Sequence, residues 1–349
     1  MSTDSQAPLP QPRDLAAHVG QLYSKYGQRK PMGQSSPSPE RPHFFLLRTF
    51  LEMNDLLVIL NTLRCRYRCF FCELPAKSSP TWIADAAVLE QFWFVTDEVR
   101  HALSIVERVS LSNEGSVLDE TTLGRAVLDE IVRAIGNMRQ VRRIELETRM
   151  EFVEVARLRE LAQLAPRAQL GILTGFETVT AHIRDRILSK REPLSVFLAG
   201  LDRVAAASAA LTAYVLLKPD PTMSDQEAVD EARASISFLV EECASRGVPL
   251  TIRLNLMYVA TGSRWGRQAL ALPTGYVPPR LTDAMRVAEE AVAAGTPVYI
   301  GLSDEGLGAP GLTYHSREDF KQSLIRLVKE FNDRNRTTFP WDQIAGMTS

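Results

Sequence analysis

Three cysteines are the residues of this chain best suited to chemistry. Cys65, Cys69 and Cys72 lie within eight residues of one another, and the chain has one other cysteine, Cys243. Three thiolates in so short a segment can bind one metal centre and leave a fourth position open for another ligand. Such close spacing is typical of iron–sulfur clusters. We therefore predict that Cys65, Cys69 and Cys72 bind a metal centre with one open coordination position.

Two other interpretations of the cysteines stay open at this point. A structural zinc site would need a fourth ligand close by, and the segment between His43 and His101 has neither a histidine nor a second CxxC. Three incidental thiols are the other alternative. Cys243 follows two glutamates in a predicted helix, where a small buried hydrophobic residue is the ordinary interpretation.

Arginines alternate with the cysteines at positions 64, 66 and 68. Their guanidinium groups could balance the negative charge of three thiolates, or they could dock an acidic electron donor. Solvated loop arginines are the alternative.

The composition excludes some classes of protein. The 349 residues are 45% hydrophobic with a formal net charge of −2, which suits one large α/β domain or two smaller ones. Nucleic-acid binding is possible but not favoured, because such proteins are usually clearly basic. No stretch reaches the roughly 18 apolar residues of a membrane span, and the first residues lack the features of a signal peptide. We expect a cytoplasmic protein with reduced thiols and no membrane partner.

Short apolar runs alternate with amphipathic helical patterns from residue 55 onward. The strand-like runs cover residues 56–60, 108–111, 143–146, 169–173, 211–217, 250–256 and 297–302. The main helical patterns cover residues 123–135, 194–207, 225–244 and 282–293. This alternation predicts an α/β fold, a partial (β/α)6-type TIM-like barrel with a C-terminal extension. In such a barrel the reactive residues lie at the C-terminal ends of the strands.

The pattern divides the chain into three regions. Residues 1–42, rich in Pro, Ser and Gln, are predicted to be a flexible N-terminal arm. Residues 43–295 form the predicted barrel core. Residues 296–349 form a predicted strand-helix extension that closes the barrel, with a helix over residues 316–334.

Polar residues stand near the ends of the predicted strands. In chain order they are Asn113, Glu114, Gly115, Glu145, Glu147, Arg149, Glu177, Tyr214, Lys218, Arg253, Asn255, Asp304 and Glu305. Alternation puts Glu145 and Glu147 on one face of their strand, where buried carboxylates need partners, and Arg149 is a plausible one. Each residue also has a structural interpretation, as a turn former, a bracing ion pair, a favourable charge at a helix N-terminus or a solvated group.

Some of these residues could take part in catalysis. The candidates are Lys218, Asp304, Glu305 and Tyr214.

The cysteine spacing is CxxxCxxC, with an aromatic residue, Phe71, just before the last cysteine. At this motif the chain resembles the radical S-adenosylmethionine (SAM) enzymes. The resemblance implies a (β/α) barrel in which three cysteines hold a [4Fe–4S] cluster and the methionine moiety of SAM chelates the fourth iron. It also implies that an electron cleaves SAM to methionine and a 5′-deoxyadenosyl radical, and that the aromatic residue touches the adenine.

Further segments resemble the branch of the archaeosine-forming radical SAM lyase and the elongator catalytic subunit. They are residues 113–119, 147–153, 175–178 with Lys190, and 216–219. The resemblance covers about residues 55–285, and Met150 and Asp220 stand where the branch often has proline. Together with the polar strand ends it gives the predicted SAM contacts. These are Phe71, Asn113, Glu114, Gly115, Glu147, Glu177, Lys190, Lys218 and Asn255.

Three functions remain open. The first is a radical SAM enzyme that abstracts hydrogen from a polar small molecule of a natural-product pathway, with flavodoxin or ferredoxin as electron donor. The second is the same chemistry on a tRNA base, as the nearest resemblance implies. The third is a non-catalytic iron–sulfur module. Lyase, rearrangement and coupling reactions are all compatible with the motifs.

Overall fold

An eight-stranded sheet forms the centre of the protein. The computed structural model describes residues 38–72, 74–113, 115–260, 263–273, 276–302, 313–314, 322–334 and 336–348. The strands, in sheet order, are β1 (Phe44–Phe50), β2 (Met53–Ile59), β3 (Arg108–Ser112), β4 (Arg143–Glu147), β5 (Gln169–Glu177), β6 (Ala210–Leu217), β7 (Leu250–Leu256) and β9 (Val298–Gly301). Strand β1 is antiparallel to β2, and every other neighbouring pair is parallel.

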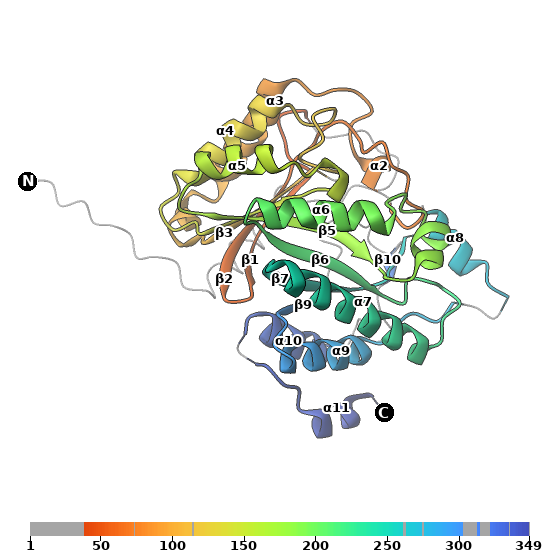
Figure 1. The fold of residues 1–349 in the computed structure, drawn as a ribbon. Coiled ribbons are helices and arrows are strands. Elements are labelled where there is room, and N and C mark those ends of the chain that lie inside the picture. Colours follow the sequence, from red (N-terminus) through yellow and green to blue (C-terminus); the bar gives the residue numbers. More distant parts are fainter. Residues whose placement is uncertain are drawn as a thin grey trace, which may run out of the picture.

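Helices cover the outer side of the curved sheet (Figure 1). The described helices are α2 (Leu74–Lys77), α3 (Asp85–Glu98), α4 (Arg125–Gly136), α5 (Val155–Leu164), α6 (Leu194–Ala206), α7 (Asp225–Arg246), α8 (Arg264–Leu270), α9 (Leu281–Ala293), α10 (Gln322–Asn332) and α11 (Trp341–Thr348). Of these, α8 lies at the end of the barrel and α11 lies apart from the sheet (Figure 1). Short helical turns η1 (Arg100–Ile105), η2 (Met150–Phe152) and η3 (Ile183–Ile187) join the other elements, and β8 (Val259–Ala260) pairs with β10 (Thr313–Tyr314). The predicted partial-barrel fold is confirmed. No described helix is long and apolar enough to cross a membrane.

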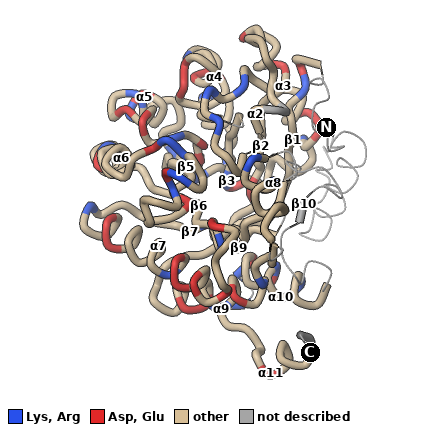
Figure 2. The backbone as a smooth tube through the Cα atoms, turned by 90° about the vertical axis from the view of Figure 1, so that its right-hand side faces the viewer, with Lys and Arg blue, Asp and Glu red and all other residues tan. Residues whose placement is uncertain are grey.

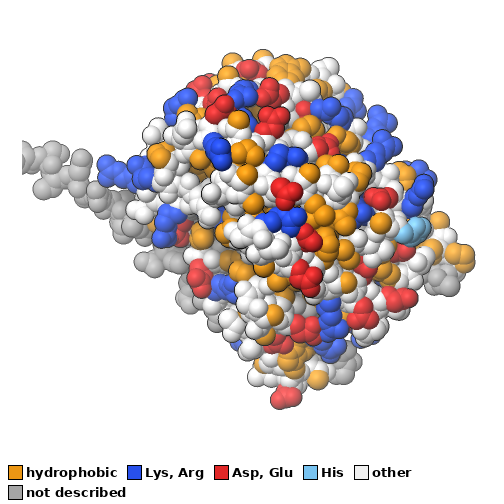
Figure 3. Space-filling model, viewed as in Figure 1, with side chains coloured by type: hydrophobic (Ala, Val, Ile, Leu, Met, Phe, Trp, Pro, Cys, Tyr) orange, Lys and Arg blue, Asp and Glu red, His pale blue; other side chains and the backbone are white. Residues whose placement is uncertain are grey.

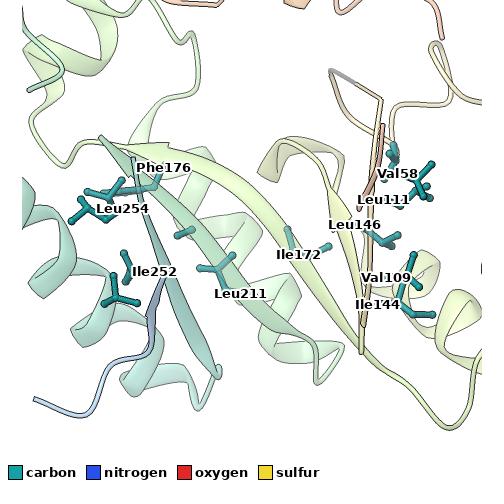
Figure 4. Close-up of a cluster of buried hydrophobic side chains, with 14 of the residues drawn as sticks. Val58, Val109, Leu111, Ile144, Leu146, Ile172, Phe176, Leu211, Ile252 and Leu254 are labelled. Atoms are coloured by element: carbon teal, nitrogen blue, oxygen red, sulfur yellow. The ribbon is translucent and has the colours of Figure 1, made fainter. Parts of the chain in front are cut away.

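Strand alternation separates the core from the barrel interior. One face of every parallel strand carries apolar side chains that pack under the helices, as in Val58, Leu111, Ile172 and Leu211 (Figure 4). Because successive strand residues point to opposite faces, the residues between them point into the barrel. The core therefore lies between sheet and helices, which leaves the interior for polar groups.

Charged side chains fill the interior near the amino-terminal ends of the strands. Asp55 accepts hydrogen bonds from Arg48 Nε and Ser110 Oγ, each at 2.8 Å. Glu145 accepts from Arg143 Nε at 2.7 Å and lies 3.8 Å from Arg108. The prediction that Arg149 pairs with Glu145 is therefore wrong, because the partners come from the start of β4 and from the neighbouring strand.

The two edge strands of the sheet are joined by side chains. The rings of Phe50 in β1 and Tyr299 in β9 stack with centroids 4.4 Å apart. The Asn332 amide at the end of α10 donates to Ile300 O and accepts from Ile300 N, both at 2.8 Å. The Asn332 carbonyl accepts from Leu51 N at 3.0 Å. Helix α10 thus bridges β9 and the β1–β2 turn, and the domain boundary at residue 296 stays a prediction.

Several predicted elements differ from the structure. Strand β1 was not expected. Between β5 and α6 the chain forms the turn η3, which the main helical patterns did not include. The φ of Ser189 (+48°) and of Arg191 (+54°) prevents a helix from continuing through Lys190. The expected helix at 316–334 is described as α10, Gln322–Asn332. Of the predicted arm, residues 1–37 lie outside the described residues.

Candidate active site

The cysteine loop follows β2 at the carboxyl-terminal end of the sheet, the end that faces the viewer in Figure 2. Along this loop Arg64, Arg66 and Arg68 are exposed, whereas Cys65 and Cys69 are partly buried. An extended segment turns alternate side chains in opposite directions, so the arginines face solvent and the thiols face inward.

All three cysteines of the loop line one cavity at the mouth of the barrel. The other described residues that line it are Tyr67, Phe71, Leu74, Gly115, Glu147, Thr148, Arg149, Gly175, Glu177, Lys190, Tyr214, Leu216, Arg253, Asn255, Leu256, Met257, Tyr258 and Gly301. They come from the loops or ends of β2 to β7 and β9. The carboxyl-terminal strand ends therefore lie around one cavity, as expected for a barrel.

Backbone hydrogen bonds hold the cysteine loop on both sides. Phe70 N donates to Leu188 O, and Trp265 N at the start of α8 donates to Phe70 O, both at 2.8 Å. Cys69 Sγ lies 3.8 Å from the Lys190 carbonyl oxygen. The loop is therefore fixed by the segment after η3 and by α8 rather than by its own sequence alone.

Burial sets the protonation of the thiols. It raises the pKa of Cys65 and of Cys69, and the cations Arg149 and Lys190 act in the opposite direction on both. Arg149 donates to Lys190 O at 3.0 Å and to Arg191 O at 2.9 Å, so its charge is fixed beside the cysteines. These cations favour the thiolate forms that a metal centre requires.

Tyr67 adds to this arrangement. Its ring packs under the Arg149 guanidinium, 3.8 Å from the centroid, and its hydroxyl donates to Glu151. Burial and the Glu151 carboxylate raise the pKa of Tyr67 to about 12, so it stays neutral.

The thiols do not converge on one point. Among the described residues, no group of three or more His, Cys, Asp or Glu side chains is arranged to hold a single metal ion. A [4Fe–4S] cluster does not need convergence, because each cysteine binds a different iron atom. The donor set of three cysteines around one cavity fits a cluster better than a zinc ion.

A buried charge group lies beside the cysteines. Lys190 Nζ is 3.3 Å from Glu192 and 3.7 Å from Glu177. Burial raises the pKa of Glu177, partly offset by Lys190. Burial lowers the pKa of Lys190, but Glu192 and Glu177 outweigh it, so that pKa is raised. Glu192 also accepts from Met150 N at 2.9 Å, which leaves Glu177 and Lys190 as the members that line the cavity.

Glycines keep space open for these groups. A Cβ on Gly175 would overlap the Glu177 carboxylate, and one on Gly115 would lie 3.2 Å from Cys65 Cβ. Glu177 itself has φ +70° and stands at a register shift between β5 and β6. The mouth is thus shaped by backbone features that side-chain patterns do not reveal.

The opposite wall is polar. Arg253 donates to the Tyr214 hydroxyl at 3.2 Å. The Asn255 Oδ1 atom is buried and has no hydrogen-bond partner among the described residues, and a side chain at Gly301 would overlap it. A carbonyl oxygen without a partner at a cavity wall is suited to accept a hydrogen bond from a ligand.

Some predicted site residues do not line the cavity. The Asn113 side chain donates to Thr122 Oγ1 at 3.2 Å and accepts from Gly115 N at 3.2 Å, so it shapes the turn. Lys218 takes φ +65° and lies 3.8 Å from Asp225. Glu114, Asp304 and Glu305 lie outside the described residues.

Other cavity residues were missed by the sequence prediction. They are Tyr67, Leu74, Leu256, Met257, Tyr258 and Gly301, with Glu192 behind Lys190. Of these, Tyr67 carried a signal, because it lies between two of the cysteines. Thr148 and Leu216 also line the cavity, and they stand in segments that carry the resemblance.

No protein-family model matches the chain. Archaeosine synthase subunit beta of Thermococcus kodakarensis is 25% identical over 289 residues, which is 79% of this chain and 84% of the relative. The predicted resemblance is confirmed. An uncharacterized protein of Methanocaldococcus jannaschii is 22% identical over 208 residues, 58% of this chain and 56% of that protein.

Solved structures of radical SAM enzymes are similar at a lower level. Methylornithine synthase has a TM-score of 0.49 at 11% identity, with 97% of both chains covered. A radical SAM methyltransferase from Kitasatospora setae, solved with cobalamin and a [4Fe–4S] cluster, has a TM-score of 0.41 at 12% identity. That alignment covers 83% of this chain and about half, 53%, of the methyltransferase.

Proposed function

We propose that this chain is a radical SAM enzyme whose [4Fe–4S] cluster is held by Cys65, Cys69 and Cys72. The observation that carries the proposal is that these three thiols and the buried Glu177–Lys190 pair line one cavity. A non-catalytic iron–sulfur module would have no use for a charged cavity beside its cluster.

The cavity residues suit the two charged ends of an amino acid. Lys190 offers an ammonium group to a carboxylate, and Glu177 offers a carboxylate to an ammonium group. When bound, the cluster and SAM supply a 5′-deoxyadenosyl radical that takes a hydrogen atom from the substrate. Phe71, Leu216 and Met257 give an apolar wall for a flat ring such as adenine.

The polar wall suits a polar small-molecule substrate. Tyr214, Arg253 and Asn255 offer a hydroxyl, a guanidinium and an amide to the cavity. These groups bind and orient oxygen- or nitrogen-rich molecules, such as intermediates of a natural-product pathway.

A tRNA base is the second candidate substrate. A relative with 25% identity, which covers 79% of this chain and 84% of its own length, is named archaeosine synthase subunit beta. A gel-shift assay with unfractionated tRNA at low salt distinguishes the two, because phosphate contacts give strong, salt-dependent binding. Binding that disappears with added salt favours tRNA, and no binding at low salt favours the small molecule.

Cysteine variants test the proposed function. After anaerobic reconstitution, Cys65→Ala, Cys69→Ala and Cys72→Ala should each lose the absorbance near 400 nm and form at least about 100-fold less 5′-deoxyadenosine from SAM and dithionite. Cys243→Ala is the matched control, because Cys243 is buried in α7 outside the cavity, and it should keep both. Full activity in the three variants would overturn the proposal.

A further inference from the structure

Four exposed arginines surround the cysteine loop. Arg64 and Arg68 stand on the loop itself, each next to a cysteine in sequence. The guanidinium of Arg264, at the start of α8, lies 3.9 Å from the ring centroid of Phe70 within the loop. Arg191 is exposed next to Lys190, whose carbonyl oxygen is 3.8 Å from Cys69 Sγ. We call these four residues the arginine patch.

No arginine of the patch forms an ion pair with any described residue. Other exposed arginines do: Arg100 pairs with Asp97, Arg125 with Glu160 and Arg142 with Glu107. Even within the loop, Arg66 pairs with Asp119 at 2.7 Å. The patch therefore presents positive charge that the described part of the protein does not neutralise.

The patch lies on the outer side of the segment whose inner side carries the thiols. Burial alternates along residues 64–69, with arginines exposed and cysteines partly buried. A partner that covers the patch would therefore sit against the backbone of the cysteine loop.

We propose, on the basis of the function proposed above, that the arginine patch docks an acidic electron-transfer protein. The donor loses one electron at this face. That electron breaks the C5′–S bond of SAM and yields methionine and the 5′-deoxyadenosyl radical, so no atom needs to cross the docking surface. Charge complementarity of this kind speeds encounter and sets orientation more than it adds affinity.

An acidic protein fits the patch better than a nucleic acid does. A nucleic-acid site commonly spreads six or more phosphate contacts along a basic stripe. The arginine patch, by contrast, is confined to one loop and its two supports. Figure 3 shows acidic and basic side chains interspersed over the face of α6 and α7, with no extended basic stripe there, and the net charge of the whole chain is −2.

Direct binding is the first test, and it needs no cluster. Flavodoxin, a small acidic flavoprotein, and a [2Fe–2S] ferredoxin are titrated against the full chain without metal at low and high salt. We expect one of them to bind at low salt, and R64E/R68E to weaken that binding about tenfold. The matched control is R139E/R326E. Arg139 and Arg326 are also exposed and form no ion pair with any described residue, and Arg139 precedes β4 at the opposite end of the barrel.

Electron delivery is the second test. With the reconstituted protein, R64E/R68E and R264E should slow 5′-deoxyadenosine formation driven by the reduced protein donor about tenfold. The rate with dithionite, which needs no docking, should change less than threefold. If reconstituted wild-type protein forms no 5′-deoxyadenosine with dithionite, the proposed function is refuted instead of the docking proposal.

Three outcomes would overturn the docking proposal. Neither acidic protein binds wild type at low salt, the patch and control variants bind equally, or the patch variants lose only tRNA binding. The last result would assign the patch to a nucleic acid.

Discussion

The two ends of the barrel interior differ in how their polar side chains are used. Near the amino-terminal strand ends, Asp55 and Glu145 are paired with arginines and hydroxyls at hydrogen-bond distance. At the carboxyl-terminal ends, Glu177 and Asn255 face a cavity, and glycines keep the space in front of them open. The first end contributes to the stability of the fold, and the second keeps groups available for ligands.

Removing a buried carboxylate near the amino-terminal strand ends should have the largest effect on stability. Glu145→Gln leaves Arg108 and Arg143 buried with less compensation, and we expect the free energy of unfolding to fall by about 3 kcal/mol. The matched control on the same strand is Glu147→Gln, which faces the cavity and should cost less than about 1 kcal/mol. Urea unfolding of both variants checks this, and equal losses would contradict the comparison.

Replacing an asparagine by leucine should have the second-largest effect on stability. Asn332→Leu removes two hydrogen bonds to Ile300 and should lower the free energy of unfolding by about 2 kcal/mol. The same change at Asn255 removes an unpaired amide, so stability should stay within about 0.5 kcal/mol while SAM or substrate affinity falls. A larger stability loss at Asn255 than at Asn332 would show that Asn255 is structural.

Replacing the two glycines of β5 should have the smallest effects, and the two variants should differ in which property changes. Gly171→Ala would place a Cβ 2.6 Å from the Glu145 carboxylate, which should cost about 1 kcal/mol of stability without changing SAM affinity. Gly175→Ala would displace Glu177 and should weaken SAM binding about tenfold. Calorimetric titration with SAM compares the two variants. Equal SAM affinities would show that Glu177 does not contribute to SAM binding.

The sequence predicted the fold well because strand spacing and helix periodicity repeat along the chain. All seven expected strands form, and their carboxyl-terminal ends meet at one mouth. Strand β1 was missed since its antiparallel pairing with β2 breaks the βαβ pattern.

The site was predicted in part. The cysteines, Gly115, Glu147, Glu177, Lys190 and Asn255 do share a cavity. Lys218, predicted from its place at a strand end and from the resemblance, does not line it. Its backbone is left-handed, and its ammonium group lies 3.8 Å from Asp225. The partner of Glu145 was wrong because Arg143, two residues earlier on the same face of β4, pairs with it. Arg149 instead donates to the carbonyl oxygens of Lys190 and Arg191.

The central claim is that a [4Fe–4S] cluster and SAM share the cavity of the cysteine loop. The most direct measurement is the electron paramagnetic resonance spectrum of the reconstituted, reduced protein with and without SAM. Binding of SAM at the open iron changes the environment of the cluster, so we predict a shift of the g-values on addition of SAM. Identical spectra at saturating SAM, with full cluster occupancy, would contradict the account.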